Sequence, residues 1–447
     1  MTLSPTLLKY ARQNTPRYTS YPTAPHFHAG IDGDVFGDWL GALDTDAAGS
    51  LYLHIPWCRE MCWYCGCSTR ATTRDEPVAS YAATLLKEID LVADRMAGRR
   101  RIAHIHFGGG TPTILSEDQL SAVMESLRQR FDVLDTAEIA IEIDPRIFTA
   151  SLASHLARLG FNRASLGVQT FDAGVQAKIN RIQPLETVAA CADALRAAGI
   201  TNLSFDLLYG LPGQTLEACR ETVTAALALE PDRFSVFGYA HVPHMKRHQK
   251  LIRDEDLPGT EARIEQALAI AVAVQAAGYH PIGIDHYART GDEMARQANA
   301  GTMRRNFQGY TTDQASFLIG LGASAISQMP AGYAQNTADV ASWSRAIESG
   351  HLATARGIAQ SGEDRIRGEI IERLMCDLEA DPDAIAAQFG GALDQADLDD
   401  LLSDGVIHRQ GRRIAIANDY RMLARVVAAR FDGYLQANTA ARHSVSV

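Results

Sequence analysis

The sequence predicts an α/β fold in which parallel strands alternate with helices and form an open, partial (β/α)6 barrel. From about residue 51, short apolar runs alternate with longer segments whose apolar residues recur at i, i+3, i+4 and i+7. Six such strand–helix units favour parallel strands with helices packed outside. Only the less regular segment HPIGIDHYA (280–288) follows them, whereas a closed eight-fold barrel would need two more units.

The predicted strands share short apolar runs bounded by turn or helix residues. In chain order they are LYLHIP (51–56), IAHIHFGG (102–109), EIAIEID (138–144), RASLGVQ (163–169), NLSFDLLYG (202–210) and RFSVFGYA (233–240). The segments between them, such as LSEDQLSAVMESLRQRF, carry the helical period.

Two segments without this rhythm flank the barrel, as a chain of 447 residues allows. Residues 1–45 form an N-terminal arm that contains PRYTSYPTAPHF, and residues 46–360 form the barrel with its extension. Residues 361–447 form a mostly helical C-terminal domain in which GVIHRQGRRIAI predicts a β-hairpin. Acidic residues outnumber basic ones there, which argues against a winged-helix DNA reader.

Composition and charge exclude several classes of protein. The net charge of −11 argues against affinity for nucleic acid through phosphate neutralisation. The N-terminus has no signal-peptide pattern, and no apolar run is long enough to span a bilayer. We therefore expect a cytoplasmic protein, where clustered cysteines are metal ligands or catalytic thiols more often than disulfides. Cys191, Cys219 and Cys376 stand apart in helical surroundings, and we expect them to be buried.

The segment HIPWCREMCWYCGCSTR (54–70) places Cys58, Cys62, Cys65 and Cys67 in the spacing C-x3-C-x2-C-x-C. A structural zinc usually takes two ligand pairs from separate segments, and no second pair follows. A closed four-thiolate iron–sulfur cluster matches the ligand count, although Cys65 and Cys67 are separated by one residue. The third alternative uses the first three cysteines for a [4Fe–4S] cluster and leaves one iron open for a substrate or cosubstrate.

Further candidate residues lie where the predicted strands end. GGGTPT (108–113) follows the second strand, and its glycines would let the backbone approach a ligand closely. Glu142 ends the third strand, Gln169 ends the fourth, and Asp206 lies in the fifth. Parallel barrels build their sites at the carboxyl ends of strands, so we expect these residues to face one site.

The C-x3-C-x2-C spacing, with Tyr64 before the third cysteine, closely resembles the signature of the radical S-adenosylmethionine (SAM) superfamily. The resemblance implies a [4Fe–4S] cluster held by Cys58, Cys62 and Cys65, with Cys67 left over. It also implies that the open iron binds the amino and carboxylate groups of SAM. Reductive cleavage of SAM would then give methionine and a 5′-deoxyadenosyl radical.

Other motifs narrow the resemblance: PRYTSYPTA, the CGC ending of the cysteine loop, IHFGGGTPT, EIDP, GVQTF, NRIQ, FDLLYGLPGQT, FGYAHVP, GIDHYA and NFQGYTT. Together and in this order they are similar to the oxygen-independent coproporphyrinogen III oxidase (dehydrogenase) family, from about residue 14 to 435. The resemblance implies oxidative decarboxylation of two propionates of coproporphyrinogen III to vinyl groups, which gives protoporphyrinogen IX in haem biosynthesis. PRYTSYPTA and CGC argue against the alternative, a haem-binding chaperone of the sister branch.

The same resemblance implies two SAM molecules per site and a set of contacts. The residues matched to the cluster-bound SAM are Tyr52, Gly109, Glu142 and Ile326; those matched to the second SAM are Tyr64, Gly110, Thr111, Gln169, Arg181, Asp206 and Ala240. It further implies a monomer that takes electrons from a donor such as a flavodoxin or ferredoxin.

A substrate with four propionates needs local cations in an acidic chain. Our hypothesis for these cations is Arg17, Arg289 and Arg305, because each stands in or beside one of the motifs above. We also expect Tyr18 and Tyr21 of the arm to close over the ring system and exclude water.

Overall fold

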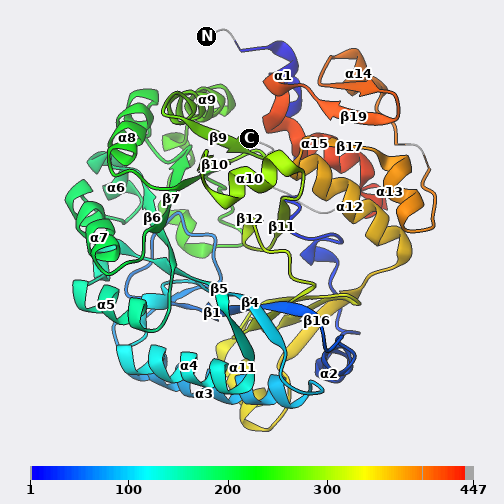
Figure 1. Cartoon of the computed structure of the whole chain (residues 1–447). Coiled ribbons are helices and arrows are strands. Elements are labelled where there is room, and N and C mark those ends of the chain that lie inside the picture. The colour runs from blue at the N-terminus through cyan, green and yellow to red at the C-terminus, as the bar shows by residue number, and fades with distance from the viewer. Residues whose placement is uncertain (1–2, 395, 438–447) are drawn as a thin grey trace.

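The computed structural model describes residues 3–394 and 396–437, and a twelve-stranded sheet forms its centre (Figure 1). Six neighbouring strands run parallel in chain order: β1 (Ala48–Ile55), β4 (Arg101–Gly109), β5 (Asp132–Ile143), β6 (Arg163–Gln169), β7 (Asn202–Tyr209) and β8 (Arg233–Gly238). All six coincide with predicted strands. The sheet ends in β16 on one side and β9 on the other, and no pairing joins these two strands in the described part. The predicted open, partial α/β barrel is confirmed.

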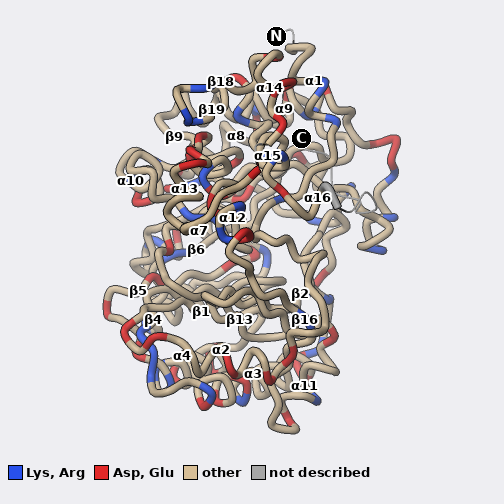
Figure 2. The backbone as a smooth tube through the Cα atoms, turned by 90° about the vertical axis from the view of Figure 1, so that its right-hand side faces the viewer, with Lys and Arg blue, Asp and Glu red and all other residues tan. Residues whose placement is uncertain are grey.

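Helices cover the outer face of the parallel strands (Figure 1). They are α3 (Glu76–Asp94), α4 (Glu117–Arg130), α5 (Ala150–Arg158), α6 (Ala173–Lys178), α7 (Leu185–Ala197), α8 (Leu216–Ala228) and α9 (Thr260–Ala276). The sequence specifies α4 locally: Ser116 caps it in a reciprocal box with Gln119, and Leu120, Met124 and Leu127 are buried on its inner face. Charged residues follow the outer helices, whereas the central strands carry few (Figure 2).

The sheet is extended on both sides of the six strands. Next to β8, β10 (His286–Arg289) and β9 (Tyr279–Ile282) continue it antiparallel, in the irregular segment HPIGIDHYA. Next to β1, β13 (Phe317–Leu321) is parallel, and β14 (Ile326–Met329), β15 (Gly332–Asn336) and β16 (Thr354–Ala359) follow antiparallel. Also in this region lie α10 (Glu293–Ala300), β11 (Arg304–Asn306), β12 (Gly309–Thr311) and α11 (Val340–Glu348).

The C-terminal part is mostly helical, with a small sheet. Its helices are α12 (Gly362–Cys376), α13 (Pro382–Gln388), α14 (Asp399–Ser403), η6 (Asn418–Leu423), α15 (Ala424–Ala428), η7 (Ala429–Phe431) and α16 (Gly433–Ala437). The predicted hairpin is present as β18 (Ile407–Gln410) and β19 (Arg413–Ile416), and β17 (Glu379–Ala380) adds a third strand. Every helix within the described ranges is too short or too polar to cross a bilayer.

The first half of the N-terminal arm packs on this C-terminal part, and its second half packs on the barrel. It contains α1 (Pro5–Ala11) and α2 (Gly33–Gly41), with η1 (Ala24–His26) between them. Tyr18 and Tyr21 are buried in the apolar core that the arm shares with α12 and α15. The hydroxyl of Tyr18 donates to Asp432 at 3.0 Å, and that of Tyr21 accepts from the N–H of Gly433 at 2.9 Å. These hydroxyls fasten the arm to the C-terminal domain. Both tyrosines also line a pocket together with Arg305, and their closure over the ring system stays a prediction.

Candidate active site

The cysteine loop leaves the carboxyl end of β1 and is closed at its base. The short strand β2 (Trp57–Cys58) pairs in parallel with β3 (Arg70–Ala71), so the residues between them form a pinned loop. The N–H of Trp63 donates to the carbonyl of Ile179 at 2.9 Å and fixes the middle of the loop on the segment after α6. The loop is therefore held over the end of the barrel where the other candidate residues lie.

Two of the thiols are surrounded by hydrogen-bond donors. The sulfur of Cys58 lies 3.3 Å from the hydroxyls of both Thr69 and Thr111. Guanidinium nitrogens of Arg146 and Arg181 lie 3.5 Å and 3.6 Å from the sulfur of Cys62. Burial raises the pKa of the Cys58 thiol, but the two threonine hydroxyls oppose this shift. Such donors stabilise sulfur in its thiolate form, which is the form that binds metal.

Cys67 lies beside Cys65. The N–H of Cys67 donates to the sulfur of Cys65 at 3.4 Å. A hydrogen bond between the two thiols is the largest cause that lowers the pKa of Cys65 to about 7 and raises that of Cys67 well above its ordinary value. Cys67 thus supports Cys65 as a thiolate.

The arrangement fits a cluster better than a single ion. Within the described residues, no three His, Cys, Asp or Glu side chains are close enough to share one metal ion. The charges of Cys62 and Cys65 nevertheless act on Cys58, so the three thiols share one neighbourhood. A [4Fe–4S] cluster needs this spread, because each thiolate binds a different iron.

Residues matched to the cluster-bound SAM lie together next to the loop. The N–H of Gly109 donates to a carboxylate oxygen of Glu142 at 3.0 Å, and a Cβ on Gly108 would lie 2.7 Å from Glu142 and 2.9 Å from Tyr52. Gly320 of β13 connects Tyr52 with Ile326. It pairs in register with Tyr52, and a Cβ added to it would lie 2.5 Å from the carbonyl oxygen of Ile326. The structure thus brings all four of these predicted residues to one place.

Glu142 stays ionised although it lies inside the barrel. Burial alone would raise its pKa, but His106, whose Nε2 lies 3.3 Å from the carboxylate, and the N–H of Gly109 outweigh burial and hold the pKa below its usual range. The side chain keeps 40% of its surface exposed, so it faces an interior space. Glu142 therefore offers a negative charge to a cationic group that enters this space.

Residues matched to the second SAM surround Gly167 on β6. A Cβ on Gly167 would lie 2.9 Å from the amide of Gln169 and 3.1 Å from the guanidinium of Arg181, and Gly167 pairs in register with Asp206. Gln169 has a φ of 66°, a rare conformation for a side-chain-bearing residue that is frequent at functional sites. Burial and the charge of Glu142 raise the pKa of Asp206 to about 6.

The remaining matched residues contact the cysteine loop itself. Thr111 bonds to Cys58, and a Cβ on Gly110 would lie 2.5 Å from the hydroxyl of Thr69. The carbonyls of Tyr64 and Ala240 both accept from the amide nitrogen of Gln249, at 2.9 Å and 3.3 Å. Gln249 was not among the predicted residues, yet its side chain connects two that were.

Gln249 belongs to a segment after β8, residues 243–250, that holds the cysteine loop from outside. The ammonium of Lys246 donates to the carbonyl of Cys67 at 2.8 Å, and Nε2 of His248 lies 2.7 Å from the carbonyl oxygen of Cys65. The unusually basic sequence PHMKRHQK was the available signal for this contact.

Five arginines lie where the arm, the barrel and the C-terminal domain adjoin. They are Arg17 of the arm, Arg263 of α9, Arg305 of β11, Arg421 of η6 and Arg425 of α15, here called the arginine cluster. Arg17 acts electrostatically on Arg263 and Arg425, Arg305 also acts on Arg425, and Arg421 and Arg305 share the neighbour Tyr310. Burial, followed by the charges of neighbours that include Arg17 and Arg305, lowers the pKa of Arg425 to about 10. Within the described residues, Nη1 of Arg305 and Nε of Arg421 have no hydrogen-bond acceptor. The cluster thus has capacity for added anions.

The arginine cluster lies at the same end of the barrel as the matched residues. Arg263 packs against Gly210 and Gly238, at the carboxyl ends of β7 and β8. A Cβ added to these glycines would lie 2.6 Å and 3.1 Å from guanidinium nitrogens of Arg263. Asp206, a matched residue, has His286 of β10 as a neighbour that acts on it electrostatically. The same histidine acts on Asp285, and Asp285 in turn interacts with Arg305 and Arg425. The cations therefore adjoin the site that Asp206 lines.

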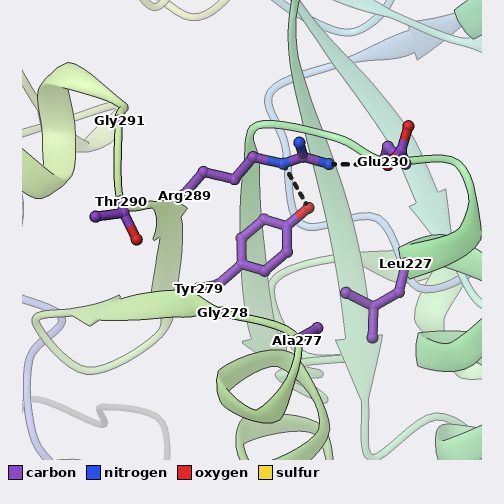
Figure 3. A pocket seen from close by; sticks show the side chains of 8 residues that line it. All are labelled: Leu227, Glu230, Ala277, Gly278, Tyr279, Arg289, Thr290 and Gly291. Atoms are coloured by element: carbon purple, nitrogen blue, oxygen red, sulfur yellow. Dashed lines mark hydrogen bonds and ion pairs between the residues drawn. The ribbon is translucent and has the colours of Figure 1, made fainter.

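Arg289, the third cation that we expected to hold the substrate, is elsewhere. Its N–H donates to the carbonyl of Asp232, at the amino end of β8 and so opposite to the cysteine loop. Its side chain lines a surface pocket of about 460 Å³, donates to Tyr279 at 3.2 Å and lies 3.9 Å from Glu230 (Figure 3). The prediction that Arg289 joins Arg17 and Arg305 is wrong.

Comparison with known proteins identifies first a class and then a family. The model of the radical SAM superfamily matches residues 52–226, which span the cysteine loop and the first five parallel strands. The chain is 51% identical to the oxygen-independent coproporphyrinogen III oxidase of Bradyrhizobium diazoefficiens, over 96% of each chain, and 41% identical to that of Pseudomonas aeruginosa, over 94% and 93%. The solved coproporphyrinogen III oxidase of Escherichia coli, described as a radical SAM enzyme, superposes with a TM-score of 0.90 at 36% identity, over 97% of this chain and all of that one. This chain belongs to the oxygen-independent coproporphyrinogen III oxidase family, and its radical SAM class implies a [4Fe–4S] cluster and SAM.

Proposed function

We propose that this chain catalyses the oxygen-independent oxidative decarboxylation of two propionates of coproporphyrinogen III, giving protoporphyrinogen IX for haem biosynthesis. The arginine cluster is the observation that carries the proposal. A tetracarboxylate substrate needs several cations at once, and an acidic chain has to gather them locally. Arg263 supplies such a cation at the carboxyl ends of β7 and β8. Arg17 acts electrostatically on Arg263, and Arg17 and Arg305 both act on Arg425, so further cations adjoin it.

The proposed cofactors are a cluster on Cys58, Cys62 and Cys65 and two SAM molecules. When bound, they supply the radical that removes a hydrogen from the propionate. Arg146, Arg181, Thr69 and Thr111 support this assignment because their donors surround the thiols of Cys58 and Cys62.

The two SAM molecules are assigned to two groups of residues. The first group consists of Tyr52, Gly109, Glu142 and Ile326; the second consists of Tyr64, Gly110, Thr111, Gln169, Arg181, Asp206 and Ala240. Glu142 supports the first group because its charge and its hydrogen bond to Gly109 suit an ammonium ligand. The strained backbone at Gln169 supports the second.

The proposal extends to the partner and to the organisation of the chain. We propose a monomer that works in the cytoplasm and takes electrons from a flavodoxin or ferredoxin. We also propose the three units 1–45, 46–360 and 361–447, with the first fastened to the last through Tyr18 and Tyr21.

An anaerobic assay tests the function. The reconstituted protein is mixed with dithionite, SAM and coproporphyrinogen III, and protoporphyrin is followed together with 5′-deoxyadenosine. We expect one deoxyadenosine for each vinyl group formed and no product without SAM. Cys62→Ala should lose cluster and product together, whereas Cys67→Ser should keep its full iron content.

Other outcomes would overturn the proposal. If deoxyadenosine forms without a vinyl product, the protein is a radical SAM enzyme that acts on another substrate. Tight haem binding without either product would identify a haem chaperone of the sister branch.

A further inference from the structure

The segment that holds the cysteine loop presents apolar side chains to solvent on its outer side. Met245 and Leu251 expose 69% and 57% of their surface. Each stands one or two residues from a side chain that bonds to the loop: Lys246 to Cys67, and Gln249 to Tyr64. A single exposed apolar side chain is ordinary, but several gathered at one place indicate an interaction surface.

A third exposed apolar residue joins them from the other side of the loop. Ile182 is 60% exposed and follows Arg181, which bonds to the sulfur of Cys62. The amide of Asn180 in the same segment donates to the carbonyl of Met61 at 3.0 Å, so this segment also contacts the loop. Ile182, Met245 and Leu251 are three of the five large apolar residues that are exposed in the described chain, and they flank one loop.

Cations accompany these apolar residues. Arg247 and Lys250 are exposed and take part in no ion pair within the described residues. The acidic residues that follow have contacts of their own. Asp256 pairs with Arg253 and Lys178, Glu255 pairs with Arg253, and Asp254 lies 2.8 Å from Nε2 of His241. Ile182, Met245, Arg247, Lys250 and Leu251, here called the loop rim, are therefore apolar and basic in a chain whose net charge is −11.

The loop rim is also connected to a candidate cluster ligand. His248, between Arg247 and Gln249, reaches the carbonyl oxygen of Cys65 at 2.7 Å. A partner seated on the rim would lie one side chain and one hydrogen bond away from Cys65. Electron transfer needs such a short path from the carrier to the cluster.

We propose that the loop rim is the docking surface for an acidic one-electron carrier protein. The carrier presents carboxylates to Arg247 and Lys250 and an apolar centre to Met245 and Leu251. It then gives up one electron and is oxidised, and the cluster bound at Cys65 gains that electron. The inference rests on the proposed function only in that the reaction needs a reduced cluster. Weak, salt-dependent binding is the expected regime for such an electron-transfer encounter.

A charge-reversal pair tests the surface. Arg247→Glu combined with Lys250→Glu is compared with Lys87→Glu combined with Arg409→Glu, which makes the same charge change at exposed residues on α3 and β18. Binding to an oxidised acidic flavodoxin is measured by calorimetry at low and at moderate salt, with basic cytochrome c as the unrelated carrier. We expect the rim variant to raise the Kd for flavodoxin about tenfold or more, because several charge contacts are reversed. We expect the control variant to change it less than about threefold, since only the net charge of the chain differs.

Activity separates this inference from the proposed function. Dithionite needs no docking surface, so the rim variant should keep wild-type turnover with dithionite and lose it with reduced flavodoxin. Met245→Ser should weaken flavodoxin binding without altering its salt dependence.

Two binding results would overturn the docking surface: equal weakening of flavodoxin binding by the two charge-reversal pairs, or unchanged binding of flavodoxin by the rim variant. So would a raised KM for coproporphyrinogen III with dithionite, which would assign these cations to the substrate. Loss of dithionite-driven turnover in the wild-type protein would instead count against the proposed function.

Discussion

The guanidinium of Arg181 lies between the thiol of Cys62 and the carboxylate of Asp144. Its Nη1 is 3.6 Å from the sulfur and 3.4 Å from a carboxylate oxygen, and Nη2 donates to the carbonyl of Gly167 at 2.7 Å. One planar cation thus connects the cysteine loop, the end of β5 and the end of β6. Sequence comparison assigned Arg181 to a ligand, whereas the structure shows that it also holds the thiol.

Arg181→Lys should weaken cluster retention. A lysine ammonium cannot donate to Cys62, Asp144 and Gly167 in the fixed directions of a guanidinium. Loss of such a supporting contact typically weakens metal binding about 10–100-fold. We expect faster loss of iron to a chelator, followed by absorbance and iron content, in the variant than in Arg158→Lys, an exposed control on α5. Equal rates of iron loss would show that Arg181 does not support the thiol.

Asp206→Asn should stabilise the protein without cofactors at neutral pH. The folded-state pKa of Asp206 is raised from 3.8 to about 6, so folding favours the neutral carboxyl. The stability that this group contributes is complete below pH 3.8 and is lost as the pH rises to about 6. At pH 7.5 the ionised group therefore destabilises the fold by about 1–3 kcal/mol.

Thermal unfolding of apoprotein measures this effect. Asp206→Asn should have the higher midpoint at pH 7.5, and the difference should shrink as the pH falls toward 4. Asp193→Asn, on the exposed face of α7, should change little at either pH. A lower midpoint for Asp206→Asn at pH 7.5 would mean that the fold needs the charge. Retention of a destabilising carboxylate is what a binding site, rather than a packing role, would require.

Local patterns predicted the framework well because each depends on neighbouring residues. The buried residues Ile139, Ile141 and Ile143 recur at every second position, and this pattern defines β5 whatever lies beside it. Strand order then places Glu142 beside the glycine run, as expected. The place of Arg421 in the arginine cluster and the hydrogen bonds of Gln249 to the cysteine loop were not predictable in this way. They depend on how the C-terminal domain folds back on the barrel and on how residues 243–250 cross the loop, and no periodicity encodes either. Arg289 was misplaced for the same reason, since proximity to a motif does not determine which end of a strand a side chain occupies.

Gln249→Met should loosen the segment that covers the cysteine loop. Gln249 is fully buried; its amide nitrogen donates to the carbonyl of Tyr64, and its oxygen accepts from the N–H of Val242 at 2.6 Å. Methionine fills similar space but leaves these buried groups unpaired, at about 1–3 kcal/mol for each. We expect faster proteolysis within residues 243–250 by trypsin, identified by mass spectrometry. Gln314→Met, which removes an exposed amide near α10, should leave this cleavage rate unchanged. An unaltered rate in Gln249→Met would mean that Lys246 and His248 hold the segment on their own.

Arg421→Met should weaken binding of the tetracarboxylate without altering the chemistry of the bound substrate. Arg421 is half-buried in the C-terminal domain, and desolvation lowers its pKa, so this cation is held at a cost in the absence of an added anion. A propionate that pairs with it would recover about 1.5–3 kcal/mol, which corresponds to a rise of about tenfold or more in KM when the arginine is lost. kcat with dithionite should stay close to wild type. Arg409→Met on the hairpin strand β18 is the matched control.

A binding experiment tests the same residue without turnover. Coproporphyrin III and protoporphyrin IX differ in carboxylate number, and the binding of each is followed by fluorescence quenching. Arg421→Met should lose affinity for coproporphyrin III in particular; equal loss for both porphyrins would instead indicate a packing role for Arg421. Because Arg421 and Arg17 come from opposite ends of the chain, a specific loss would also explain why the arm is fastened to the C-terminal domain. Only when these two parts adjoin can their guanidinium groups face the same substrate.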